Sequence, residues 1–169
     1  DPSSFGVTTG CIQAISEKYE GRMLVGAGTV LTTEQVEMTA KAGGRYIISP
    51  NVDVDVIRRT VELGMVSIPG AMTPTEVIVA HNAGAGFVKV FPAGNLGTGY
   101  IKAIKAPISH VKLMAVGGIN AENFGDFLKA GTVGAGIGGN LANKQWIDAG
   151  EFNKITETAR ELVEIAKNA

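Results

Sequence analysis

Hydrophobic residues along the chain gather in short runs that alternate with longer segments of helical periodicity. The runs have the length of β-strands, and six strands are expected, at residues 23–30, 46–49, 66–69, 87–91, 112–116 and 134–137. Amphipathic segments follow the first five runs and predict helices over residues 33–42, 54–63, 74–83, 99–106 and 121–130. The chain therefore repeats a strand–helix unit.

Local signals mark where several of these helices begin and end. A glycine that can adopt the left-handed conformation follows four of them, at Gly43, Gly64, Gly84 and Gly131. The segment Thr73-Pro74-Thr75-Glu76 has the pattern of a capping box, in which the glutamate bonds back to the start of its helix. We therefore expect Glu76 to stabilise a helix start rather than to act as a catalytic acid.

The repeat predicts an α/β protein with a parallel sheet that is buried on both faces. Units of about 20–25 residues with glycines after the strands favour a (β/α)8 TIM barrel. The glycine fingerprint of a doubly wound nucleotide-binding sheet does not occur in the expected context. The chain opens on a loop over residues 1–6 and a helix over residues 9–19, so we expect a barrel without its first strand, first helix and second strand. A six-stranded open sheet is the alternative.

Residues 1–169 are expected to form a single, N-terminally incomplete barrel domain, because this length is enough for one core. Residues 148–167 have apolar side chains at helical spacing and predict a C-terminal helix of the same domain. Trp146 is a candidate anchor for that helix.

Charge and composition exclude several classes of function. The chain has 15 Lys and Arg against 16 Asp and Glu, without the basic stripe of a nucleic-acid-binding protein. The one cysteine, Cys11, and the two histidines, His81 and His110, are far apart in sequence, so we expect no metal site. No apolar run approaches the roughly 18 residues of a membrane span, and no signal peptide is evident. We expect a cytoplasmic protein with no cofactor and no nucleic-acid or membrane partner.

The most informative position is Lys89, which lies in an apolar run. If this run is a strand, its alternation puts Phe87, Lys89 and Phe91 on one face. An amine between two aromatic rings loses hydration, which lowers its pKa, and the neutral amine can attack a carbonyl carbon to form a Schiff base. The alternative is a lysine that only extends from the strand end into water.

The carboxyl ends of the strands bear the functional groups in a (β/α)8 barrel. Here these ends have mostly glycine, proline and small polar residues, and Lys89 is the only charged side chain among them. Gly117-Gly118 and Gly138-Gly139 follow the last two strands, where backbone N–H groups are suited to bind a phosphate. One amine among exposed amides suits an anionic ligand with a carbonyl group. Thr29, after the first strand, could bind a carboxylate or satisfy a buried backbone group.

Five motifs occur in order along the chain: Gly26–Leu31, Ser49-Pro50, Pro69-Gly70 with Thr73–Glu76, Val88–Ala93 and Val116–Ile119. Together they resemble the 2-keto-3-deoxy-6-phosphogluconate (KDPG) / 4-hydroxy-2-oxoglutarate (KHG) aldolases, class I pyruvate-forming enzymes of the Entner–Doudoroff branch. The resemblance extends from about Gly6 to the terminal helix. Residues 51–65 and 99–106 also resemble the related 2-keto-3-deoxy-6-phosphogalactonate aldolases.

The resemblance implies a TIM-barrel lyase that forms a Schiff base on Lys89 and releases pyruvate with either D-glyceraldehyde 3-phosphate or glyoxylate. It implies further that Thr29 binds the pyruvyl carboxylate, that Phe91 packs over the imine and that Pro69 lines the pyruvyl pocket. The 6-phosphate would be bound by the backbone amides of Gly117, Gly118 and Gly139. The reaction needs no metal, and the expected assembly is a homotrimer.

The sequence departs from the family pattern at three places. The general-base glutamate and a neighbouring arginine belong upstream of the segment that resembles residues 1–4, so we expect this chain to be part of a longer protein. Val116 replaces a common threonine, and Gly139 stands where a phosphate-binding serine is common. The alternatives are another phosphate-binding barrel, such as a thiamine-phosphate synthase, and a non-enzymatic barrel fragment.

Overall fold

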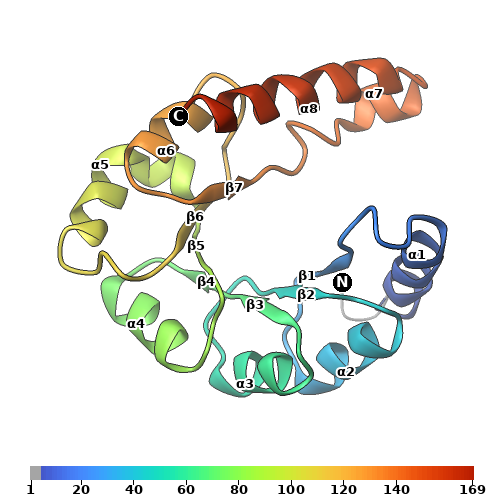
Figure 1. The fold of residues 1–169 in the computed structure, drawn as a ribbon, viewed down its shortest axis with the longest axis horizontal. Helices are drawn as coiled ribbons and strands as arrows, with labels where there is room; N and C mark the ends of the chain where they lie inside the picture. The colour runs from blue at the N-terminus through green and yellow to red at the C-terminus, as the bar shows by residue number, and fades with distance from the viewer. Residues whose placement is uncertain (1–4) are drawn as a thin grey trace. The chain divides into compact units, whose positions relative to one another are not determined.

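The structure is a computed structural model that describes residues 5–169, in which short strands alternate with helices (Figure 1). The first four residues of the predicted opening loop lie outside the described residues. The chain forms two compact units, residues 1–88 and 89–169, which divide inside the strand that contains Lys89. The organisation of the whole chain as one barrel domain stays a prediction.

The first unit has a parallel sheet whose strands follow the chain order. The elements of this unit are α1 (Phe5–Lys18), β1 (Gly26–Gly28), α2 (Thr33–Lys41), β2 (Tyr46–Ile48), α3 (Val54–Glu62), β3 (Val66–Ile68), β4 (Gly70–Ala71) and α4 (Pro74–Asn82). β1 pairs with β2 and β2 with β3, so that Ala27 lies opposite Ile47 and Ile47 opposite Ser67. The predicted alternation of parallel strands and helices is confirmed here.

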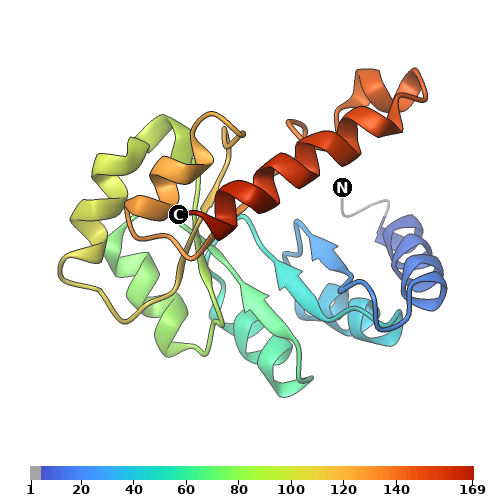
Figure 2. The ribbon, with the colours of Figure 1, turned by 45° about the horizontal axis from the view of Figure 1, so that its top comes forward.

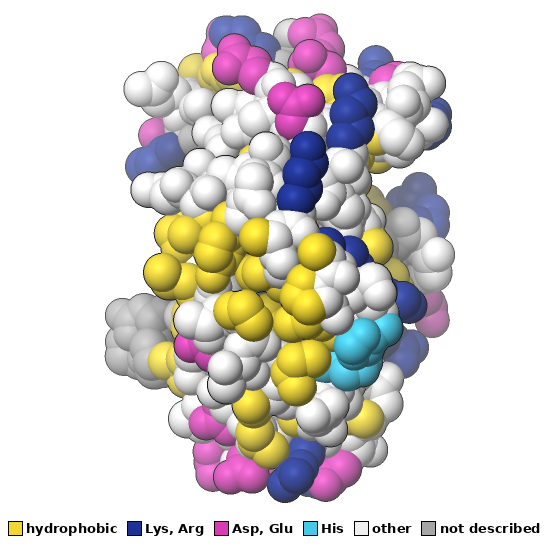
Figure 3. Space-filling view, turned by 90° about the vertical axis from the view of Figure 1, so that its left-hand side faces the viewer, with side chains coloured by type: hydrophobic (Ala, Val, Ile, Leu, Met, Phe, Trp, Pro, Cys, Tyr) yellow, Lys and Arg dark blue, Asp and Glu magenta, His cyan; other side chains and the backbone are white. Residues whose placement is uncertain are grey.

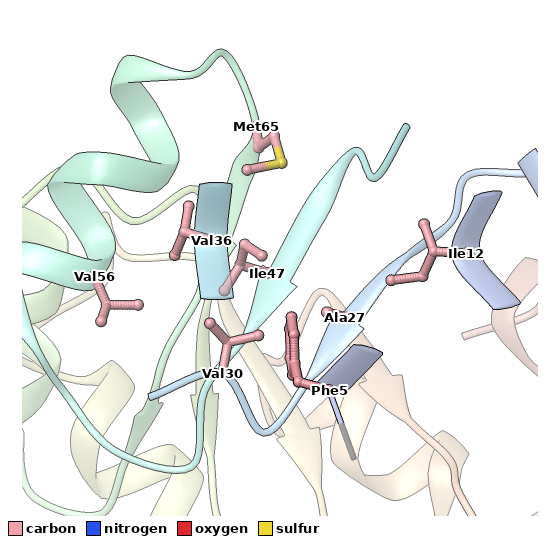
Figure 4. Packing of buried hydrophobic residues seen from close by; sticks show 8 residues of the cluster. All are labelled: Phe5, Ile12, Ala27, Val30, Val36, Ile47, Val56 and Met65. Carbon is pink, nitrogen blue, oxygen red and sulfur yellow. The ribbon is translucent and has the colours of Figure 1, made fainter. Parts of the chain in front are cut away.

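The core of this unit lies between the sheet and the helices α1, α2 and α3 (Figure 4). Its buried side chains come from every one of these elements: Phe5, Ile12, Ala27, Val30, Val36, Ile47, Val56 and Met65. α1 begins at Phe5, earlier than the predicted residue 9. Burial of the Phe5 ring, which is 6% exposed, favours this start although glycine at positions 6 and 10 lowers helix propensity.

The strands of the first unit are shorter than predicted. β1 does not include Met23 and Leu24, which are 54% and 76% exposed, and it ends before Thr29, whose φ of +58° is incompatible with a strand. The predicted strand 66–69 ends at Ile68, because Pro69 has no N–H group to continue the ladder.

The helix boundaries agree closely with the local signals. Thr32, Asp53 and Thr73 cap the N-termini of α2, α3 and α4 with their side chains. The four glycines that follow predicted helices all have positive φ, of +87°, +71°, +104° and +109° for Gly43, Gly64, Gly84 and Gly131. These left-handed residues end their helices as predicted.

The second unit has the elements β5 (Val88–Val90), α5 (Ala93–Lys105), β6 (Leu113–Val116), α6 (Phe124–Lys129), β7 (Gly134–Gly136), α7 (Lys144–Asp148) and α8 (Phe152–Lys167). Strands β5, β6 and β7 are neighbours in that order. β6 and β7 are parallel, with Met114 opposite Gly134 and Val116 opposite Gly136. The strands that precede the two predicted glycine loops therefore lie side by side.

Three helices of this unit differ from their predicted bounds. α5 begins at Ala93 and is interrupted at Gly97, which has a φ of +78°, so the predicted helix 99–106 is only its second part. The predicted C-terminal helix 148–167 begins later, as α8 at Phe152, because Gly150, with a φ of +71°, separates it from the short helix α7, which the sequence pattern does not predict. α8 packs against α6 and α7 (Figure 2). Trp146 lies half-buried in α7.

The surface is in agreement with the balanced charge. On the face drawn in Figure 3, Lys and Arg side chains occur beside Asp and Glu side chains. Within residues 5–169, every helix is too short or too polar to traverse a bilayer.

Candidate active site

Lys89 is the middle residue of β5, and all three residues of that strand are buried. The Lys89 side chain is 7% exposed, and it is the only charged side chain among residues 5–169 that is buried. Its Nζ atom lies 5.2 Å from the centre of the Phe91 ring. None of the ion pairs within the described residues includes Lys89.

Burial lowers the pKa of the Lys89 amine, because desolvation disfavours its charged form. A larger fraction of the amine is then neutral near pH 7 than in an exposed lysine. Nucleophilic attack on a ketone requires the neutral form. The environment of Lys89 is therefore suited to the formation of a Schiff base, and the alternative of a solvated lysine does not fit its burial.

β5 ends at Val90, so Phe87 and Phe91 lie just outside the strand rather than on its face. Phe91 nevertheless lies over the amine, and it is 43% exposed, whereas its packing over the imine stays a prediction. The same ring packs against Gly117: a Cβ atom at position 117 would lie 2.9 Å from Cε2 of Phe91. Gly117 has a φ of +89°, so both its conformation and its contact require glycine.

The loop that follows β6 is held by four hydrogen bonds to its successive carbonyl oxygens. Gly94 N–H, at the start of α5, donates to the Gly117 carbonyl at 2.8 Å. The carbonyls of Gly118, Ile119 and Asn120 accept from Asn123 Nδ2 (2.9 Å), Asn140 Nδ2 (2.8 Å) and Phe124 N (3.0 Å), respectively. These donors come from three segments of the second unit, and each fixes one peptide plane of the loop.

The helix after this loop begins later than predicted. Asn120 Oδ1 accepts from the backbone N–H groups of Glu122 and Asn123, and Asn123 Oδ1 accepts from the Asn120 N–H. These bonds hold a turn over residues 120–123, so α6 starts at Phe124 instead of residue 121. The N–H groups of Gly118 and Ile119 donate to no acceptor among residues 5–169. They are available to bind an anion, and the binding of the substrate phosphate by Gly117 and Gly118 stays a prediction.

The second glycine pair lies in the loop after β7. Gly138 carbonyl accepts from the N–H groups of Leu141 and Ala142, both at 2.9 Å, and forms a tight turn. The Gly139 N–H donates to no acceptor among the described residues, and a Cβ atom there would meet nothing within 4 Å. Because Val116 and Gly136 are opposite each other in the sheet, the two glycine loops leave it at the same edge.

Two predicted site residues, Thr29 and Pro69, belong to the first unit. Thr29 is the only non-glycine residue with positive φ among residues 5–169. A β-branched residue in this conformation is strained, and such strain is concentrated at functional sites. The Thr29 side chain is exposed and Pro69 is buried. Their action on a substrate bound to Lys89, in the second unit, stays a prediction.

Glu76 forms the predicted capping box with Thr73. Its Oε2 atom accepts from the N–H groups of Met72 and Thr73, both at 2.8 Å, and these bonds lower the pKa of its carboxyl group. The carboxylate is thus engaged at a helix start. His81 lies in α4 and His110 in the turn before β6. Within residues 5–169, no three His, Cys, Asp or Glu side chains are grouped so that they could hold a metal ion.

Each unit has a surface cavity. One, of about 650 Å³, is in the first unit and includes Arg22, Lys41 and Arg45 in its wall. The other, of about 460 Å³, lies between α6 and α8. Neither cavity includes any of the predicted site residues.

Alternating parallel strands and helices, with a buried lysine at a strand beside two glycine loops, are typical of class I aldolases built on (β/α)8 barrels. Residues 6–158 match the family described as KDPG and KHG aldolase, and the chain belongs to this family. The predicted fold class is thereby confirmed. The assignment favours an aldolase over the alternative of a thiamine-phosphate synthase.

Relatives with known names support the assignment. The chain is 45% identical over 131 residues to the 2-dehydro-3-deoxy-6-phosphogalactonate aldolase of Escherichia coli K12, a match that covers 77% of this chain and 64% of the relative. It is 35% identical over 158 residues to the KHG/KDPG aldolase of the same organism, covering 92% of this chain and 73% of the relative. The chain thus spans less than two thirds of the phosphogalactonate enzyme.

Solved structures agree with these relatives. One described as a native KDPGal structure superposes with a TM-score of 0.85 at 39% identity, and the match covers 93% of this chain and 75% of that one. The KDPG aldolase of Legionella pneumophila, with pyruvate captured as a covalent carbinolamine, superposes with a TM-score of 0.84 at 26% identity. That match covers 92% of this chain and 76% of that one.

Proposed function

We propose that the protein is a class I aldolase in which Lys89 forms the Schiff base. The observation on which this rests is that Lys89 is buried, has a lowered pKa and lies under the Phe91 ring. The covalent capture of pyruvate in the related Legionella enzyme supports the same chemistry.

The reaction follows from the neutral amine. Lys89 Nζ attacks C2 of a 2-keto acid to give a carbinolamine, and loss of water gives an iminium ion. The C3–C4 bond then breaks: its electron pair moves toward the iminium nitrogen to form an enamine, and the C4 hydroxyl loses its proton as the aldehyde leaves. Protonation of C3 and hydrolysis release pyruvate and restore the amine. The family resemblance assigns the proton transfers to a glutamate that is not in residues 1–169.

The preferred substrate is 2-keto-3-deoxy-6-phosphogalactonate, which would be cleaved to pyruvate and D-glyceraldehyde 3-phosphate. The identity of 45% to a phosphogalactonate aldolase, against 35% to a KHG/KDPG aldolase, favours this substrate. The second candidates are its C4 epimer, 2-keto-3-deoxy-6-phosphogluconate, and 4-hydroxy-2-oxoglutarate, which would give glyoxylate. Val116 and Gly139 offer no hydroxyl group, so the backbone amides of the glycine loops would bind the phosphate.

Pyruvate release from the three substrates tests this proposal. We expect kcat/KM to be highest for the phosphogalactonate and lowest for the unphosphorylated substrate, and Lys89→Ala to abolish release from all three. Equal kcat/KM for the two phosphorylated epimers would contradict the substrate preference alone. Release that persists in Lys89→Ala would contradict the proposed chemistry.

A homotrimer in the cytoplasm, and a role in an Entner–Doudoroff-type pathway, are expected from the resemblance alone. Sedimentation equilibrium of the purified protein tests the assembly, and a mass of three chains is the expected result.

A further inference from the structure

We infer that Asn140 is a positioning residue that holds the two glycine loops together and thereby sets the affinity for the anionic end of the substrate. This inference rests on the proposed function, because it assigns a role within the same site. Asn140 follows Gly139 in the loop after β7, and its Nδ2 atom donates to the Ile119 carbonyl in the loop after β6 at 2.8 Å. Among residues 5–169 it is the only side chain that joins these loops by a hydrogen bond.

The direction of the loop amides depends on such bonds. In a trans peptide, C=O and N–H point in opposite directions, so a bond that fixes a carbonyl also fixes the N–H of the next residue. Gly94 and Asn123 hold the carbonyls of Gly117 and Gly118, and thus orient the unpaired N–H groups of Gly118 and Ile119. The loop itself consists of two left-handed glycines, which have little conformational preference of their own.

Asn140 adds the connection between the two loops. The Ile119–Asn120 peptide is held from both sides, since its carbonyl accepts from Asn140 and its N–H donates to Asn123 Oδ1. The Ile119 side chain is 2% exposed, so this peptide is also anchored in the core. The Gly139 N–H is oriented by the two bonds that the Gly138 carbonyl accepts from Leu141 and Ala142, and Asn140 ties this exposed turn to the anchored peptide of the other loop. Preorganised amides from both loops would bind an anion without a further ordering cost.

The chain offers a matched control in the same connection. Asn143 Oδ1 accepts from the N–H groups of Gln145 and Trp146 and caps α7, but Asn143 makes no hydrogen bond to the loop after β6. Asn143→Ala and Asn140→Ala therefore both remove a side chain whose hydrogen bonds order the segment after β7. Only Asn140→Ala removes the hydrogen bond between the two loops.

The test measures kcat and KM for the phosphorylated substrate, the dissociation constant of inorganic phosphate by calorimetry, and borohydride trapping of pyruvate. In Asn140→Ala we expect the KM and the phosphate dissociation constant to rise about five- to tenfold, the effect of losing roughly one hydrogen bond. We expect kcat and the trapping of pyruvate, which has no phosphate, to stay within about twofold of the wild type. Asn143→Ala should leave all these quantities unchanged.

An unchanged KM and phosphate affinity in Asn140→Ala would overturn the inference, and so would an equal rise in Asn143→Ala or an equal loss of pyruvate trapping. Failure of the proposed function is a separate result. It would appear as a wild-type protein that traps no pyruvate, and the phosphate affinities of the two variants would still decide the role of Asn140.

Discussion

The amine of Lys89 lies 5.2 Å from the centre of the ring of Phe91, the residue that directly follows β5. The ring covers one side of the amine, and it also packs against Gly117. Phe91 thus connects the nucleophile to the first glycine loop. The predicted nucleophile and part of the predicted phosphate site are therefore neighbours within one unit of the structure.

The packing of Phe91 on Gly117 predicts that Gly117→Ala lowers the unfolding free energy much more than Gly138→Ala does. Gly117→Ala would add a Cβ atom 2.9 Å from the Phe91 ring at a φ of +89°, and we expect a loss of about 1–3 kcal/mol in unfolding free energy. Gly138→Ala would meet nothing within 4 Å at an ordinary φ, so its effect should stay within about 0.5 kcal/mol. Urea denaturation of both variants measures the difference, and equal stabilities would show that the loop is not packed as described.

The strained backbone of Thr29 predicts that Thr29→Gly is more stable than the wild type although it binds the substrate less tightly. Thr29→Gly relieves the left-handed strain, by about 1–2 kcal/mol, against a glycine entropy cost of about 0.5–1 kcal/mol, so we expect a small net stabilisation. Thr29→Ala retains the strain. Both variants lack the hydroxyl group, and both should show the same rise in KM for the keto acid. A glycine variant with full activity would exclude the predicted role of Thr29 in carboxylate binding.

The lowered pKa of Lys89 predicts how stability depends on pH. Between this lowered pKa and the ordinary value of 10.5, the unfolded chain binds more protons than the folded protein, so the contribution of Lys89 to stability rises with pH. Lys89→Met removes the desolvation penalty and keeps a side chain of similar length. We expect its Tm to exceed that of the wild type at pH 7, and the excess to shrink as the pH approaches 10. If the difference in Tm between Lys89→Met and the wild type stayed constant with pH, or had the opposite sign, burial would not disfavour the charged amine.

Much of the fold could be predicted because its signals are local. The left-handed glycines after four helices, the capping box of Glu76 and the alternation of apolar runs with amphipathic segments each depend on a few neighbouring residues. Lys89 was identifiable for the same reason, as a lone charge in an apolar run. Strand lengths were overestimated, because hydrophobic residues such as Leu24 are exposed and periodicity does not show which residues tertiary contacts bury.

Contacts between distant segments could not be predicted from the sequence. The bond from Gly94 to the Gly117 carbonyl and the bond from Asn140 to the Ile119 carbonyl each join residues about twenty positions apart. No periodic signal marks such pairs, because one hydrogen bond depends on the exact path of both loops. The late start of α6 has the same origin, since the side chains of Asn120 and Asn123 hold a turn that helical periodicity does not reveal.

The central claim is that Lys89 is the Schiff-base nucleophile, and chemical trapping tests it most directly. The protein is incubated with pyruvate and borohydride, and the modified residue is located by peptide mass spectrometry. We predict one reduced adduct, on Lys89, that is absent in Lys89→Ala and still formed in Lys112→Ala, a lysine that is exposed. The claim would be contradicted if the wild type formed no adduct, or if Lys89→Ala formed the adduct to the same extent.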